Sequence, residues 1–136
     1  MVAPAVRALA YVGVGVTGEV VYTAIKALIK KHDLRLQGYT QIWVMPAYAL
    51  GGVFLFEKVQ DLIASWNIAA RFVAYALLIY SIEYLVGVLA KWITGKCPWE
   101  YKGKWQIQGI IDLPHFPFWG AVGLIFEVVH NYLVQL

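Results

Sequence analysis

The hydrophobic positions of this chain gather in four long stretches that carry almost no charge. Helices of this length, rising 1.5 Å per residue, approach or cross a hydrocarbon core of about 30 Å. The helices of a soluble bundle would instead carry several charges along one face. The pattern therefore predicts four transmembrane helices, at Ala8–Ile25, Ile42–Phe56 with a continuation to about Ile63, Phe72–Ala90 and Phe116–Leu136.

The composition supports the same interpretation. The 136 residues are 61% hydrophobic and 14% charged, whereas about a quarter of the residues of a typical soluble domain are charged. A chain this short has too little interior to bury such an excess. We therefore predict an all-α integral membrane protein, a single transmembrane domain over residues 1–136 that contacts the lipid bilayer of a bacterial-type inner membrane.

Positive charge is concentrated around two long polar connections, at about residues 30–41 and 94–112. Eight lysines and arginines lie in or beside these connections, and three lie on the opposite side. By the positive-inside rule, both connections are expected in the cytoplasm and both termini outside. No basic stripe is interleaved with aromatic residues, so nucleic acid is not an expected partner.

The two halves of the chain resemble each other. Phe56–Asp61 matches Phe126–Asn131 in its Phe-Glu pair and its valine, and Glu19 then corresponds to Glu83. Each unit contains two spans, so the second unit enters the membrane from the same side as the first. This predicts two parallel-topology helix-pair repeats, about residues 5–65 and 68–136, related by an axis along the membrane normal. Such an axis would bring Glu19 towards Glu83 and Glu57 towards Glu127.

Each predicted span carries one glutamate in or at the end of its apolar stretch. A charge at the bilayer centre costs at least ~2.5 kcal/mol, so these side chains are expected to face the protein interior. Helical spacing places tyrosines, glycines and a histidine on the same faces. The pattern predicts an intramembrane cluster that binds a cation, protons or a polar ligand, formed by Glu19, Glu57, Asp61, Glu83, Glu127, His130, Tyr22 and Tyr80.

Other interpretations of the cluster remain open. Protonated or lysine-paired glutamates would also cross-link the helices without further function. A metal-dependent enzyme is another reading, because di-iron bundles use Glu-x-x-His motifs. Glu127-Val128-Val129-His130 is one such motif, and Glu19 and Glu83 would be its further ligands, but Gln60 stands where the second motif requires histidine. The sequence requires no cofactor, and an enzyme is the less favoured reading.

The second long connection contains a compact motif, Cys97-Pro98-Trp99-Glu100-Tyr101. It is expected to anchor at the lipid headgroups or to cap the mouth of the helix bundle. With Gly18-Glu19, Glu83-Tyr84, Gly109 and Trp119 preceding Glu127, this motif resembles the transmembrane protein 229 family and the grouped putative ABC-transporter type IV (CmpB-like) family. The resemblance runs from about Gly15 to Glu127, and many members of these families have aspartate where this chain has Glu100.

The resemblance implies a small polytopic membrane protein with a transport-type role, and it supplies neither a substrate nor a cofactor. The chain has no Walker motif with which to bind and hydrolyse ATP. Four short helices make a thin-walled bundle, so a homo-oligomer or a larger membrane complex is expected. A non-catalytic accessory or assembly subunit of such a complex is the alternative function.

Overall fold

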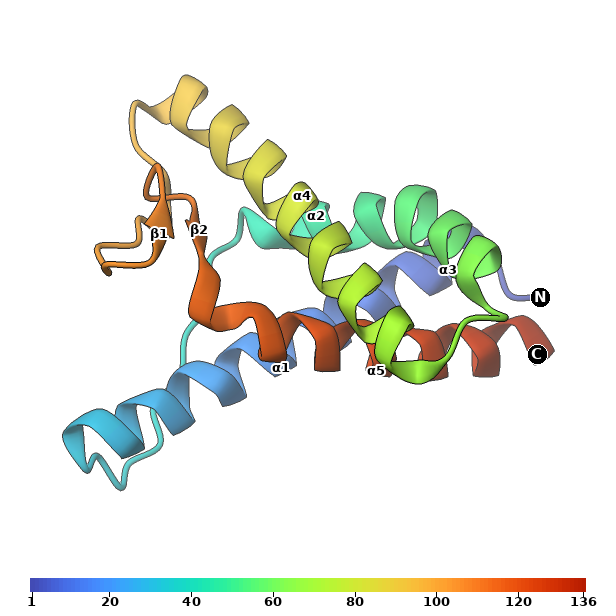
Figure 1. The fold of residues 1–136 in the computed structure, drawn as a ribbon, viewed down its shortest axis with the longest axis horizontal. Coiled ribbons are helices and arrows are strands. Elements are labelled where there is room, and N and C mark those ends of the chain that lie inside the picture. Colours follow the sequence, from blue (N-terminus) through green and yellow to red (C-terminus); the bar gives the residue numbers. More distant parts are fainter.

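Helices form at all four predicted stretches in the computed structural model, which describes residues 1–136 (Figure 1). The two longest are α1 (Pro4–Lys31) and α4 (Ile68–Thr94). Pro4 occupies the first turn of α1, where its missing N–H has no helical acceptor to lose. Asn67 caps α4, because its side-chain oxygen accepts from the N–H of Ala70 at 2.9 Å. Gly95 ends α4 in the left-handed conformation.

The second stretch is one continuous helix whose hydrogen bonding changes in its middle. It consists of α2 (Val44–Leu50), a π-helical segment η1 (Gly51–Phe56) and α3 (Glu57–Ile63). The π turn begins at a glycine pair that packs tightly against neighbouring helices. A Cβ on Gly52 would lie 2.4 Å from Tyr11 in α1, and a Cβ on Gly51 would lie 3.0 Å from Ile82 in α4. Small residues at this point therefore let three helices approach closely.

The last helix, α5 (Phe116–Gln135), follows the second long connection. This connection contains a hairpin of β1 (Gln106–Ile107) and β2 (Ile111–Asp112), then a 3₁₀ turn η2 (Leu113–His115). The hairpin is antiparallel, with Ile107 opposite Ile111. Helix α4 packs along α5 through the glycine stripe predicted from the sequence. Phe72 and Tyr75 lie against Gly120 and Gly123, where an added Cβ would lie 2.4 and 2.2 Å from their side chains.

Only two of the four helices are long and apolar enough to cross a membrane on their own. These are α1 and α4, whereas α2–α3 and α5 are not. Of the four predicted transmembrane helices, all four form as helices, and two of them, α1 and α4, are confirmed as long and apolar enough to span. The second stretch is divided by η1, and the twenty residues of α5 include Glu127, His130 and Asn131, which lower its mean hydropathy.

The core is a group of aromatic rings between the four helical segments. Phe56 is central, with ring centroids 4.9 Å from Tyr75 and 5.5 Å from Phe126. Tyr11 completes the group at 5.1 Å from Phe126. Both termini lie at one end of the molecule, and the hairpin and the end of α1 lie at the other (Figure 1). The aromatic core thus separates two ends that carry different polar groups.

Candidate functional site

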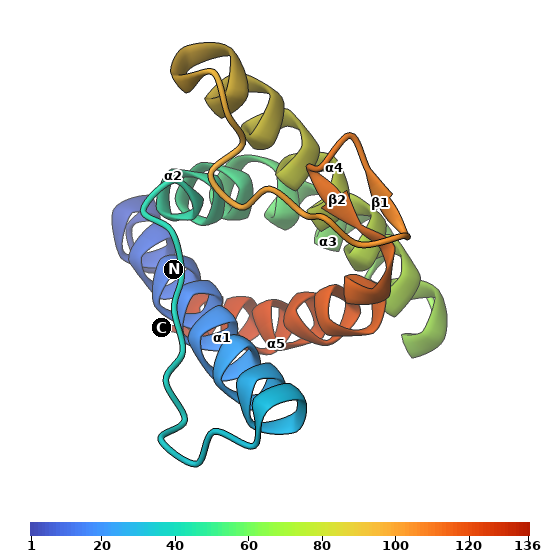
Figure 2. The ribbon, with the colours of Figure 1, turned by 90° about the vertical axis from the view of Figure 1, so that its left-hand side faces the viewer.

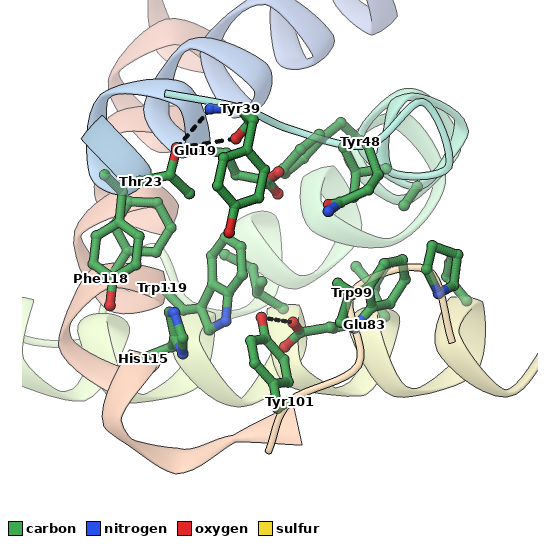
Figure 3. A pocket seen from close by; sticks show the side chains of 18 of the residues that line it. Glu19, Thr23, Tyr39, Tyr48, Glu83, Trp99, Tyr101, His115, Phe118 and Trp119 are labelled. Carbon is green, nitrogen blue, oxygen red and sulfur yellow. Dashed lines mark hydrogen bonds between the residues drawn. The ribbon is translucent and has the colours of Figure 1, made fainter. Parts of the chain in front are cut away.

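A cavity of about 870 Å³ opens at the end of the molecule that carries the two long connections. Figure 2 looks at this end and shows α1, α2, α4 and α5 arranged in a ring. The cavity is lined by α1, the α2–η1 helix, α4, the start of α5 and the Cys97–Gly103 segment (Figure 3). Phe56 and Phe126 form its floor against the aromatic core. Of the four glutamates that were predicted to lie in the spans, Glu19 and Glu83 line this cavity, and Glu57 and Glu127 do not.

Glu19 is held on the α1 wall by two hydroxyl groups. Tyr48 donates to its Oε1 at 2.6 Å, and Thr40 donates to its Oε2 at 2.5 Å. The contact with Tyr48 depends on Gly15, one turn earlier in α1, because the Tyr48 ring lies where a Cβ would stand. Both carboxyl oxygens therefore have a donor, and each retains a further lone pair for a ligand.

Glu83 lies on the α4 wall with one of its oxygens unpaired. Tyr101 donates to Oε1 at 2.9 Å, but Oε2 is buried without a hydrogen-bond partner. Trp119, which is 5% exposed, also lines the cavity, and its indole N–H is buried without a partner. The indole lies beside the Glu83 carboxyl group. Because buried polar groups are normally paired, an unpaired acceptor and an unpaired donor in one cavity indicate a ligand-binding position.

The Cys97–Tyr101 motif forms one wall of the cavity rather than an exposed loop. Trp99 donates from its indole to the carbonyl of Ile110 at 3.0 Å, and the Tyr101 N–H donates to the carbonyl of Gly109 at 2.8 Å. These bonds tie the motif to the hairpin, and Gly87 of α4 leaves room for Ile110 beneath it. Burial, with the adjacent Glu83 carboxyl, raises the pKa of the Tyr101 phenol. The phenol therefore stays protonated and acts as a donor.

The mouth of the cavity carries positive charge. Lys26, Lys30 and Lys31 of α1 and Lys102 of the connection line it. The Lys26 ammonium lies 5.7 Å from the centroid of the Tyr22 ring, a cavity residue stacked at 4.3 Å on Phe118. Burial lowers the pKa of the neighbouring His115, as does Lys26, against the opposing effect of Asp112. Glu100 also lines the cavity and is exposed, so the entrance carries an excess of ammonium groups over carboxylates, whereas Glu19 and Glu83 lie further inside.

Glu57 lies at the other end of the molecule in a different network. Arg7 donates to its two oxygens at 2.8 and 3.0 Å, and both side chains are largely buried, at 9% and 13% exposed. The hydroxyl of Tyr11 donates to the same carboxylate at 3.1 Å and lies 2.9 Å from His130 Nδ1. Glu57 is therefore neutralised by an arginine and is closed to a ligand.

Glu127 has matching partners in the second half of the chain. Tyr75 donates to its Oε2 at 2.5 Å, and Arg71 Nε lies 3.2 Å from the same oxygen. Arg71 also donates to the carbonyls of Ala64 and Trp66, at the turn between α3 and α4. The arginine, tyrosine and glutamate thus recur as one arrangement at Arg7, Tyr11 and Glu57 and again at Arg71, Tyr75 and Glu127.

The structure divides the predicted cluster and moves two of its members out. The four glutamates do not form one central group, because the aromatic core stands between the cavity pair and the arginine-bound pair. Asp61 is exposed on α3. The Tyr80 hydroxyl donates to the carbonyls of Asp112 and Leu113 and does not line the cavity. Tyr22 lines the cavity, and His130 joins the Glu57 network.

No group of three or more potential metal ligands comes together in the structure. Glu127 and His130, the candidate Glu-x-x-His ligands, have separate partners in Tyr75 and Tyr11. Sequence reasoning did not assign roles to Arg7, Arg71, Thr40 and Tyr75. The signal for the arginines and tyrosines was present, since Arg7 and Tyr11 precede Glu19 by the same spacings with which Arg71 and Tyr75 precede Glu83.

One known protein family matches almost the whole chain. The family described as putative ABC-transporter type IV matches residues 9–136, which include the cavity glutamates and the Cys97–Tyr101 motif. The chain belongs to this family. The part of the predicted resemblance that named the type IV family is therefore confirmed, and the resemblance to the transmembrane protein 229 family stays a prediction. No solved structure matches the chain.

Membership of the type IV family supports a transporter-type component, and the two apolar helices α1 and α4 support a membrane protein. The family description names no ligand, so the ligand has to be argued from the cavity itself.

Proposed function

We propose that this protein is a transport-type component of a membrane that binds a small cationic polar ligand between Glu19 and Glu83. The observation that carries the proposal is the unpaired, buried Oε2 of Glu83 in a cavity that also presents Glu19. Two carboxyl groups on facing walls favour a positively charged ligand. The aromatic lining adds attraction for an organic cation, because ring faces are electron-rich.

The outer surface supports insertion of all four helical segments, including the two that are too short or too polar to span alone. Each of them exposes large apolar side chains. On the α2–α3 helix these are 44–77% exposed (Leu50, Phe54, Leu55 and Leu62), and on α5 they are 50–69% exposed (Ile125, Val128 and Tyr132). Their buried carboxylates, Glu57 and Glu127, are paired with arginines inside the protein. The exposed charges Lys58 and Asp61 lie in α3, the last part of the α2–α3 helix, where lipid headgroups would surround them.

The proposed orientation places the cavity mouth in the cytoplasm. The lysines that line the mouth lie in or beside the two connections rich in positive charge, and such segments stay on the cytoplasmic side. Cys97 is the one cysteine of the chain and is buried, so single cysteines introduced at exposed Lys102 and exposed Leu136 would report the two sides. In spheroplasts, a membrane-impermeant maleimide should label L136C and leave K102C unlabelled until the membrane is opened.

The proposed parallel repeat is supported by the recurring arrangement of arginine, tyrosine and glutamate. Each unit pairs an arginine and a tyrosine of its first helix with the glutamate of its second helix. Together with the aromatic core, these pairs close the end of the molecule opposite to the cavity mouth. A transport cycle would have to open this end, and the two arginine–glutamate pairs are the contacts that would break.

The binding proposal is tested with a simple cation on the purified protein. Hexylamine titrated into the protein by isothermal calorimetry should give a saturable signal, and E83Q should weaken it at least tenfold because an amide cannot become an anion opposite the bound ammonium group. D61N, which changes an exposed carboxylate at the other end, is the matched control and should bind as the wild type does. Equal binding by all three proteins, with unchanged melting temperatures, would contradict the proposal.

The alternative is an accessory subunit of a larger membrane assembly, and one observation favours it. The 136 residues contain no Walker motif, so an ATP-driven role would require a partner chain that supplies the nucleotide site. In that case E83Q would leave hexylamine titrations unchanged, and its effect would appear as loss of co-purifying subunits.

A further inference from the structure

The lysines at the cavity mouth, like the other lysines of the chain and unlike its three arginines, form no ion pair with a carboxylate. Arg7, Arg35 and Arg71 each form an ion pair with a carboxylate of the chain. Lys26, Lys30, Lys31 and Lys102 form none. Unpaired ammonium groups gathered around one opening attract an anionic group. The entrance of the cavity therefore favours an anionic group, whereas the interior favours a cationic group.

Lys26 is the cation closest to the carboxyl groups along α1. It lies seven residues after Glu19, which places both side chains on the same face of the helix. The rise of an α-helix separates the two positions by about 10 Å along the axis. The ammonium of Lys26 is held over the ring of Tyr22, also a cavity residue, and not in open solvent. A single extended ligand can therefore meet both signs of charge.

The inner end of the proposed ligand site is defined by two buried polar atoms that have no hydrogen-bond partner. Oε2 of Glu83 has no hydrogen-bond donor, and the indole N–H of Trp119 has no acceptor. Trp119 is only 5% exposed. A ligand amino group would donate a hydrogen bond to Glu83, and an adjacent ligand atom with a lone pair would accept one from Trp119. These two unpaired atoms are evidence for a ligand that does not depend on the lysines.

We infer that the ligand is a small zwitterion, with an ammonium group at Glu83 and a carboxylate or phosphate group at Lys26. The inference rests on the proposed cation site and adds the anionic half of the ligand. The cation site also includes Glu19, and the rise of about 10 Å between the Glu19 and Lys26 positions of α1 favours a molecule with several atoms between its two charges over an α-amino acid. A free zwitterion and the headgroup of an ethanolamine phospholipid share this chemistry.

The test compares probes that carry one or both charges. In calorimetric titrations of the purified protein, 6-aminohexanoate should bind at least tenfold more tightly than hexylamine, hexanoate or glycine. K26Q should reduce the affinity for 6-aminohexanoate to that for hexylamine and leave hexylamine binding unchanged. K58Q, which removes an exposed lysine of α3 at the other end, is the matched control and should bind both probes as the wild type does.

The outcomes separate this inference from the proposed function. If hexylamine and 6-aminohexanoate bind equally and K26Q changes neither affinity, the site binds cations and the inference of a zwitterionic ligand is wrong. If no probe binds while the protein remains folded, the proposed cation site fails as well.

Repeating the titration of 6-aminohexanoate in nanodiscs with increasing phosphatidylethanolamine shows whether the natural ligand is a lipid headgroup or a free zwitterion. Competition by the lipid supports a headgroup ligand, and unchanged affinity supports a soluble zwitterion.

Discussion

The hydroxyl of Tyr101 donates a hydrogen bond of 2.9 Å to Oε1 of Glu83, which joins the connection after α4 to the middle of that helix. This bond holds the Cys97–Tyr101 wall against the cavity and leaves the second oxygen of Glu83 free. One tyrosine thus both shapes the cavity and orients the carboxyl group that is proposed to bind the ligand. The same bond makes the stability of the wall measurable through the buried cysteine four residues earlier.

Replacing Tyr101 by phenylalanine should expose Cys97. The loss of one hydrogen bond costs about 1 kcal/mol, so the opened wall should be populated roughly fivefold more often. Burial raises the pKa of the Cys97 thiol, which keeps it unreactive in the closed wall. The rate of Cys97 modification by a maleimide at pH 8 should therefore increase in Y101F. Y132F, which changes an exposed tyrosine of α5, should react at the wild-type rate. An unchanged rate in Y101F would show that the wall is held by its other contacts.

Replacing Gly123 by alanine should destabilise the packing of α4 on α5. The added Cβ would lie 2.2 Å from Cβ of Tyr75, and relieving such an overlap costs about 1–3 kcal/mol. The melting temperature of the detergent-solubilised protein should decrease by several degrees. G13A is the matched control, since nothing lies within 4 Å of its Cβ position on α1. A melting temperature of G123A equal to that of G13A would contradict the packing of these two helices.

Breaking the pair of Arg7 and Glu57 from one side should be costly. R7Q leaves the Glu57 carboxylate largely buried without its cation, and the expected loss is about 3 kcal/mol, the lower end of the range for a buried pair. The double variant R7Q/E57Q should recover part of this loss, because no unpaired charge remains. R35Q changes the arginine of an exposed pair with Asp33 and should leave the melting temperature unchanged. No recovery in the double variant would show that the two side chains act independently.

The stability of the fold should depend on pH through His115. Burial lowers the pKa of its imidazole, and Lys26 lowers it further. The folded state then binds the proton less readily than the unfolded state, so stability is complete above the ordinary histidine value of about 6.5 and decreases as the pH falls below it. Between pH 7.5 and 5.5, the wild-type melting temperature should decrease more than that of H115Q. H32Q, which changes an exposed ring, should keep the wild-type slope. Equal slopes in H115Q and the wild type would assign the pH dependence to other groups.

The sequence predicted the positions of the helices better than it predicted which polar residues of each helix face the interior. The four apolar stretches became helices, and α5 begins at Phe116 as predicted, because Pro117 and the preceding polar turn define its start locally. The expectation that Asp61 joins the cluster was wrong, since this residue lies on the exposed face of α3. One helical turn separates it from Glu57, and the sequence does not state how the helix is rotated about its axis.

Sequence alone determined that four helical segments form and that each contains a carboxyl group that lipid would not tolerate. This information is local, because the cost of a charge in hydrocarbon belongs to the residue that carries it. Only the tertiary structure decided that Glu57 meets Arg7, fifty residues away, while Glu83 keeps an unpaired oxygen in a cavity. These assignments depend on the packing of Tyr11 against Gly52 and of Tyr75 against Gly123, which sets how the helices are rotated and how closely they approach.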